Sequence, residues 1–76
     1  MFEFIITDVF NFDGISLLVG KGNAPLYDGK IKCGDIELDV KSSFGNHKGN
    51  LDKLSLEVID GKTDKSLIGK IFKSIA

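Results

Sequence analysis

Apolar and polar residues alternate along most of this chain with a period of two, which predicts β-strands. The clearest run covers residues 36–42, where one alternating set of side chains is apolar and the other is mostly charged. The apolar set is expected to face inward and the charged set to face water. The inward set is Ile36, Leu38 and Val40, and the outward set is Glu37, Asp39 and Lys41.

Four further segments carry strand patterns, and each is bounded by turn residues. They are residues 2–10, in which Phe2, Phe4 and Ile6 alternate with other residues, and residues 15–19, 30–32 and 54–59. Asp13-Gly14 between two apolar runs predicts a hairpin turn within residues 11–14. Two glycines and Pro25 predict that the second strand ends before residues 20–25.

The apolar residues near the C-terminus fit two structures. A helical stripe is formed by Leu67, Ile68, Ile71, Phe72 and Ile75, and Asp64 is one of the residues placed to cap such a helix. Gly69 and the β-branched content oppose a helix. Leu67, Ile71 and Ile75 also share one face of a strand, so the pattern alone leaves both structures open.

Five or six short strands separated by turns predict an all-β fold, a small closed antiparallel β-barrel of about six strands. Closure removes the free edges through which a short sheet aggregates. We expect one domain over residues 1–76, because a chain of 76 residues supplies a single small core. Its apolar content of 42% is that of an ordinary globular domain, and this opposes disorder.

Cysteine content and the absence of sorting signals indicate a cytoplasmic protein. Cys33 is the single cysteine, so an internal disulfide and a cysteine-based zinc site are excluded. The thiol is expected to pack as a small hydrophobe rather than to react. No segment reaches the roughly 20 apolar residues that span a bilayer, and no signal peptide is visible, so no membrane partner is expected.

The charge distribution disfavours strong non-specific attraction to nucleic acid. The net charge is −1, with four acids against one lysine in residues 1–28 and nine lysines against seven acids in residues 29–76. The chain has no arginine, the residue that forms bidentate contacts with phosphates and bases. A C-terminal basic patch of lysines with Phe72 nearby could still support weak RNA contact through phosphates and one stacked base. Its members are Lys62, Lys65, Lys70 and Lys73.

No cluster of residues predicts catalysis, a cofactor or a metal. His47 is the single histidine, and it lies in a glycine-containing loop without a Ser or Cys partner at a recognisable spacing. Asp35, Glu37 and Asp39 lie at every second position of a strand, where their carboxylates diverge rather than converge on one cation. We therefore expect a protein that is not an enzyme and has no cofactor.

An ordered series of motifs covers much of the chain. It consists of Phe4-Ile5-Ile6-Thr7-Asp8-Val9-Phe10, then Gly14, then Leu17-Leu18-Val19-Gly20-Lys21, then Gly29-Lys30-Ile31-Lys32-Cys33-Gly34-Asp35. This series resembles the second, β-barrel domain of translational GTPases such as elongation factor Tu. The resemblance is weak from residue 42 to residue 66, and the chain has a longer connection at residues 22–28 than the family.

The resemblance implies that residues 67–75 form the strand that closes the barrel. It also implies contact with the acceptor end of aminoacyl-tRNA or with neighbouring domains, and Lys21 matches a basic position of the family. The phosphate-binding loop of GTPases, Gly-x-x-x-x-Gly-Lys-Ser/Thr, is absent from the sequence, so nucleotide hydrolysis is not expected.

The sequence thus predicts a non-catalytic binding module that contacts RNA or a translation-related protein. The alternative is a stand-alone protein–protein adaptor or inhibitor, and either would be a monomer or a weak homodimer. Loops on a rigid scaffold usually carry recognition, so the loops at residues 20–27 and 43–50 are the expected contact regions. The expected partner-binding residues are Lys21, Asn23, Leu26, Tyr27, Phe44, His47 and Lys48.

Overall fold

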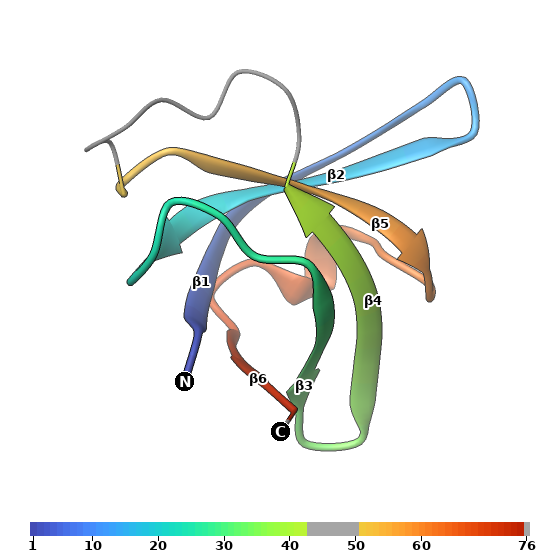
Figure 1. The fold of residues 1–76 in the computed structure, drawn as a ribbon. Coiled ribbons are helices and arrows are strands. Elements are labelled where there is room, and N and C mark those ends of the chain that lie inside the picture. Colours follow the sequence, from blue (N-terminus) through green and yellow to red (C-terminus); the bar gives the residue numbers. More distant parts are fainter. Residues whose placement is uncertain (43–50, 76) are drawn as a thin grey trace.

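A computed structural model describes residues 1–42 and 51–75 and shows six antiparallel strands that close into a barrel (Figure 1). The order around the barrel is β1-β2-β5-β4-β3-β6. The predicted all-β class and the closed six-stranded barrel are confirmed. The strands are β1 (Glu3–Phe12), β2 (Ile15–Gly22), β3 (Gly29–Cys33), β4 (Ile36–Ser42), β5 (Leu54–Asp60) and β6 (Ile71–Ser74).

The inward sides of the strands form one apolar core. In β4, Leu38 and Val40 are buried and Ile36 packs against them at the margin, as the alternation predicts. Cys33 also packs against this core, as expected of a small hydrophobe. Because water is removed from these side chains, their burial is the main stabilising term of the fold. The most completely buried residues are Phe4, Ile6, Leu18, Ile31, Leu38, Val40, Leu54, Leu56 and Phe72.

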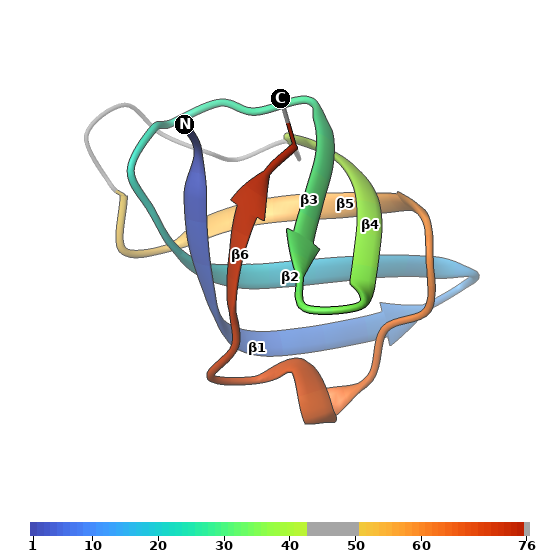
Figure 2. The ribbon, with the colours of Figure 1, turned by 90° about the horizontal axis from the view of Figure 1, so that it is seen from below.

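Strand β1 belongs to two parts of the barrel. Its first residues pair with β6, at Glu3 to Ile5, and its later residues pair only with β2. Figure 2 shows β1 starting beside β6 and then turning to run across the molecule with β2 and β5. The barrel can therefore close only if β1 turns a corner.

A β-bulge at Thr7 makes this corner. Ile6 lies opposite Gly20 and Asp8 lies opposite Val19, so Thr7 is an extra residue in β1. The Thr7 hydroxyl donates a hydrogen bond to the Val19 carbonyl oxygen at 3.1 Å, which holds the bulge to the facing strand. A bulge bends its strand and increases the local twist, and the corner requires both changes.

Gly20 allows β1 and β2 to approach closely at the same corner. A Cβ atom at this position would lie 1.9 Å from the carbonyl oxygen of Ile5, far inside van der Waals contact. The constraint at Gly20 is therefore steric, and any side chain would push the two strands apart at the bend.

Two strand ends differ from the prediction. β2 does not end at Val19 but continues through Gly20 to Gly22, because a strand glycine here marks a close approach and not a break. β1 continues to Phe12, and the turn is only Asp13 and Gly14, with φ angles of 49° and 75°. Positive φ at both central residues matches the twist of a two-residue hairpin.

The C-terminal segment closes the barrel as a strand and not as a long helix, which confirms the strand expected within residues 67–75. The strand is shorter than expected, because β6 covers only Ile71–Ser74. Asp64 caps a single turn of 3-10 helix, η1 (Lys65–Leu67), by accepting a hydrogen bond from the Ser66 amide at 2.8 Å. The chain then turns at Gly69, whose φ is 89°, and β6 pairs with β1 and β3. This turn breaks the alternation, so Leu67 and Ile71 do not share one face of a strand: Leu67 and Phe72 are buried, whereas Ile71 is exposed.

The Gly20→Ala substitution should lower the free energy of unfolding by about 3 kcal/mol or more, because the new methyl group overlaps the Ile5 carbonyl. Gly14→Ala is the matched control: Gly14 has positive φ, but a Cβ atom at this position would have no neighbouring atom within 4 Å. That variant should lose about 1 kcal/mol. Urea unfolding followed by circular dichroism measures both values, and equal losses would contradict a steric role for Gly20.

Candidate functional site

The bulge at Thr7 reverses which side chains of β1 face outward. Up to Ile6 the even-numbered residues point into the core, whereas beyond the bulge Val9 is buried and Phe10 and Phe12 point out. Phe10 is 45% exposed and Phe12 is 51% exposed. Without the extra residue, period-two alternation would place both phenylalanines on the core side.

Apolar residues of two neighbouring strands extend this exposed surface. Phe10 pairs with Leu17 and Phe12 pairs with Ile15 across the hairpin. The β2–β5 register pairs Ser16 with Val58, and Ile59, which follows Val58 in β5, is 58% exposed. We call this surface the hairpin face. Its members are Phe10, Phe12, Ile15, Leu17 and Ile59.

The other side of the hairpin is polar and is held by the chain that follows β5. The Asn11 side-chain oxygen accepts hydrogen bonds from the hydroxyls of Ser16 and Thr63, the latter at 3.2 Å. Figure 1 shows the β1–β2 hairpin extending beyond the body of the barrel. The apolar side of this extension therefore faces outward and its polar side faces the protein, the reverse of the usual arrangement.

Lys65 and Asp8 cover the edge of β1 beside the hairpin face. The Lys65 ammonium lies 3.0 Å from the Asp8 carboxylate and donates to the Val9 carbonyl at 3.2 Å. The Val9 amide donates to the same carboxylate at 2.8 Å. Both edge-directed backbone groups of Val9 are thus bonded to side chains, which opposes the addition of another strand there. The ammonium also lies 5.6 Å from the centre of the Phe10 ring, within cation–π range.

The hydrogen bond from Lys65 holds the pKa of the Asp8 carboxyl below its ordinary value of 3.8. The Val9 amide lowers this pKa further, and partial desolvation opposes both effects. Asp8 is therefore ionised at neutral pH, and the link between β1 and η1 depends on that charge.

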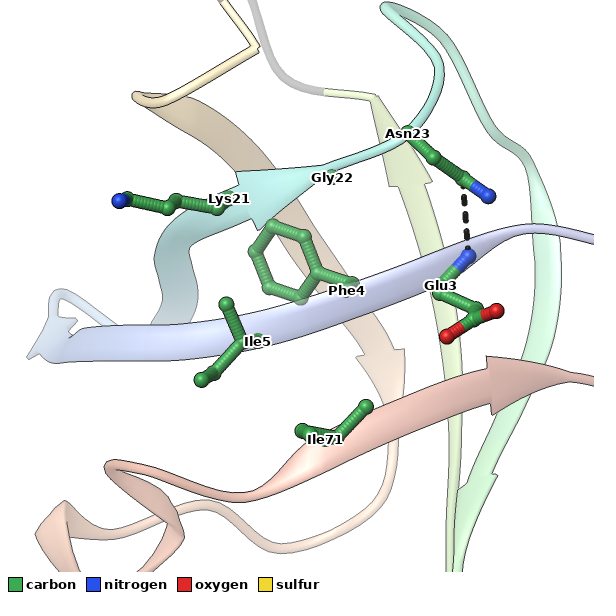
Figure 3. A pocket seen from close by; sticks show the side chains of 7 residues that line it. All are labelled: Glu3, Phe4, Ile5, Lys21, Gly22, Asn23 and Ile71. Carbon is green, nitrogen blue, oxygen red and sulfur yellow. Dashed lines mark hydrogen bonds between the residues drawn. The ribbon is translucent and has the colours of Figure 1, made fainter.

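A shallow groove of about 270 Å³ lies on the outer surface where β2, β1 and β6 run side by side (Figure 3). Two predicted contact residues, Lys21 and Asn23, are among those that line it. The Asn23 side chain accepts from the Glu3 amide and donates to the Met1 carbonyl, both at 2.9 Å. Asn23 therefore fastens the N-terminal strand to the end of β2. The lining residues are Glu3, Phe4, Ile5, Lys21, Gly22, Asn23 and Ile71.

The remaining predicted contact residues differ in accessibility. Leu26 is 69% exposed. Tyr27 stacks on Phe2 with ring centres 4.6 Å apart, and its hydroxyl donates to the Lys30 carbonyl at 2.7 Å, so it supports the barrel wall. Phe44, His47 and Lys48 lie outside the described residues. The contact roles of all seven predicted residues stay predictions.

The predicted basic patch lacks its stacking aromatic residue, because Phe72 is fully buried. Lys65, one of the four lysines, is paired with Asp8. Another, Lys73, lies between Glu3 of β1 and Lys32 of β3 in the strand register, and Lys32 lies opposite Glu37 of β4. Positive and negative residues thus share this row, so it is not a uniformly cationic surface for phosphates.

Within residues 1–42 and 51–75, no group of three or more histidines, cysteines and acids is placed to hold a metal ion. The part of the chain that the structure describes also contains no helix long and apolar enough to cross a membrane.

Comparison with known proteins found no matching family model, curated protein or solved structure. The hairpin face was not among the residues predicted from sequence. The Asp13-Gly14 turn was a usable signal, because a two-residue hairpin sets the Phe12–Ile15 and Phe10–Leu17 pairs. The bulge that turns these pairs outward had no comparable signal in the sequence.

The link between Asp8 and Lys65 should make stability depend on pH in the acid range. A carboxyl whose pKa is lowered by folding stabilises the folded state above its ordinary pKa, and this contribution is lost as pH falls through the folded value. We expect Asp8→Asn to lower the urea midpoint near neutral pH and to have little effect well below pH 3.8.

Lys65→Met provides the control for this experiment. In the Lys65→Met background the effect of Asp8→Asn near neutral pH should shrink, because the charged partner is gone. An Asp8→Asn effect of the same size at every pH would show that the charge of Asp8 does not contribute.

Proposed function

We propose that this chain is a non-catalytic binding module that docks a protein partner on the hairpin face. The observation that carries the proposal is the exposure of Phe10, Phe12 and Ile15 on the paired strands of the hairpin, together with exposed Ile59 on the neighbouring strand β5. From the usual surface of such side chains, their exposed area is about 350 Å². Contiguous apolar patches of this size on a small monomer are often functional.

The way in which the hairpin is held supports docking over incidental exposure. Hydrogen bonds from Ser16 and Thr63 fix the polar side of the hairpin, and Lys65 and Asp8 cover its edge. The two phenylalanines are therefore presented on a fixed backbone, which lowers the entropy lost on binding. Aromatic side chains held in this way are typical anchors of protein interfaces.

The accessible charged groups also support a binding role. Among the described residues no polar or charged side chain is buried, so the carboxylates and lysines are all at least partly accessible to water. Catalytic acids and bases usually owe their shifted pKa values to burial and to close charged neighbours. The two described carboxyls with shifted pKa values, Asp8 and Asp64, are lowered by hydrogen bonds within a strand edge and a helix cap.

A relationship to the second domain of translational GTPases is part of the proposal. The closed antiparallel barrel supports it. So does the glycine-bracketed run that carries the resemblance, because Gly29 and Gly34 both adopt positive φ, at 143° and 59°. An RNA partner is the second candidate, since exposed phenylalanines can stack on bases. The mixed charges along the row of Lys73 and Lys32 favour protein over RNA.

The double variant Phe10→Ser/Phe12→Ser tests the proposal. Immobilised wild-type protein should retain one or more proteins from a lysate of its source, and the double variant should lose them, because it removes both aromatic anchors. Quantitative mass spectrometry measures the difference. Ile71→Ser is the matched control, because Ile71 is exposed to the same 51% as Phe12 but lies outside the hairpin face.

The double variant must keep the far-ultraviolet circular dichroism spectrum and the cooperative unfolding of the wild type for the comparison to hold. Retention that survives in the double variant would refute docking on the hairpin face. Titration with transfer RNA at low and moderate salt separates the second candidate. Salt-dependent RNA binding that the double variant retains would place the activity on a different surface.

A further inference from the structure

The outer end of the hairpin face is negatively charged. Asp13 lies at the exposed tip of the hairpin, next to Phe12. Asp60 ends β5, next to Ile59, and in the register it lies opposite Asp39 of β4 rather than opposite a lysine. Carboxylates at directly opposed positions repel each other. Lys30 of β3 lies opposite Asp39 on its other side and offsets that charge, whereas Asp60 faces only Asp39 in the β4–β5 register.

The other carboxylates beside the hairpin face have lysine neighbours. Asp8 is paired with Lys65, and Glu57 lies opposite Lys41 in the β4–β5 register. Asp39 also has a lysine neighbour, because it lies opposite Lys30 in the β3–β4 register. Asp13 and Asp60 therefore remain as the source of negative potential next to the exposed phenylalanines. Lys62, on the connection after β5, is the nearest basic residue in sequence and offsets only part of this charge.

The geometry of the hairpin face excludes two kinds of occupant. An added strand would need the edge of β1, where the backbone groups of Val9 are already bonded to Asp8 and Lys65. A second copy of this chain would bring the same carboxylates to its partner surface.

We infer that the hairpin face binds a cationic amphipathic helix of a partner protein. A helix of this kind lays its apolar stripe across a surface without using strand edges, and its flanking lysines or arginines remain at the rim. The stripe packs on Phe10, Phe12, Ile15 and Ile59, and the basic residues lie near Asp13 and Asp60. The inference rests on the proposed function and adds the chemistry of the partner.

Two synthetic helices of about five turns provide the test. One is built of leucine and lysine, the other has the same leucine pattern with glutamate in place of lysine, and both carry a fluorophore. Fluorescence anisotropy should show binding of the leucine–lysine helix only. Phe10→Ser/Phe12→Ser should weaken this binding by about tenfold or more, as expected for the loss of two anchors.

Asp13→Asn/Asp60→Asn should weaken the same binding by about fivefold and reduce its dependence on salt, because rim charges contribute modest, screened attraction. Glu3→Gln and Ile71→Ser are the matched controls: each changes an exposed residue of the groove beside β6, and neither should alter the affinity. Equal binding of both peptides would overturn the requirement for positive charge. Binding unaffected by the hairpin variants would show non-specific attraction and would overturn the inference.

Competition separates this inference from the proposed function. The leucine–lysine helix should displace the proteins retained by wild-type chain. Some retained proteins could require Phe10 and Phe12 and yet not be displaced by the peptide. That result would support the proposed binding module but refute a cationic helix as its ligand. Retention independent of Phe10 and Phe12 would instead refute the proposed function itself.

Discussion

The close contact between the backbones of β1 and β2 at Gly20 and Ile5 is the constraint on which the rest of the structure depends. The bulge at Thr7 lies at the same place, so the strand bends where the neighbouring strand has no side chain to obstruct it. This bend allows one strand to pair with β6 at its start and to run with β2 and β5 afterwards. The same bend closes the barrel and exposes Phe10 and Phe12, so fold and proposed binding surface share one cause.

Exposed aromatic residues on a sheet usually carry a risk of aggregation, and the hairpin limits that risk through its edge. Lys65 and Asp8 bond to the backbone groups of Val9, through which a foreign strand would add. The ammonium of Lys65 lies above the ring of Phe10 as well, so one side chain serves both the edge and the face. A partner can therefore contact the exposed side chains of Phe10 and Phe12, whereas a strand cannot pair with the backbone of Val9.

The sequence predicted what depends on local pattern. Alternation located the strand of residues 36–42 with its inward set, and Asp13-Gly14 located the hairpin, because both signals act over a few residues. The bulge at Thr7 was missed because threonine fits an ordinary strand equally well, and only pairing with Gly20 distinguishes the two. The inward position of Phe72 was missed for a similar reason, since the turn at Gly69 shifts the alternation. The candidate site was therefore not predictable: a tertiary contact decides which side of the hairpin is exposed.

The two ends of the described chain are joined in one place. The Phe2 amide donates to the Ser74 hydroxyl at 3.0 Å, and the Ser74 amide donates to the Phe2 carbonyl at 2.9 Å. Figures 1 and 2 both place the N- and C-terminal labels close together and away from the tip of the β1–β2 hairpin. A short linker between the ends would therefore allow the strand order to be permuted, and a carrier attached at either end would leave Phe10 and Phe12 accessible.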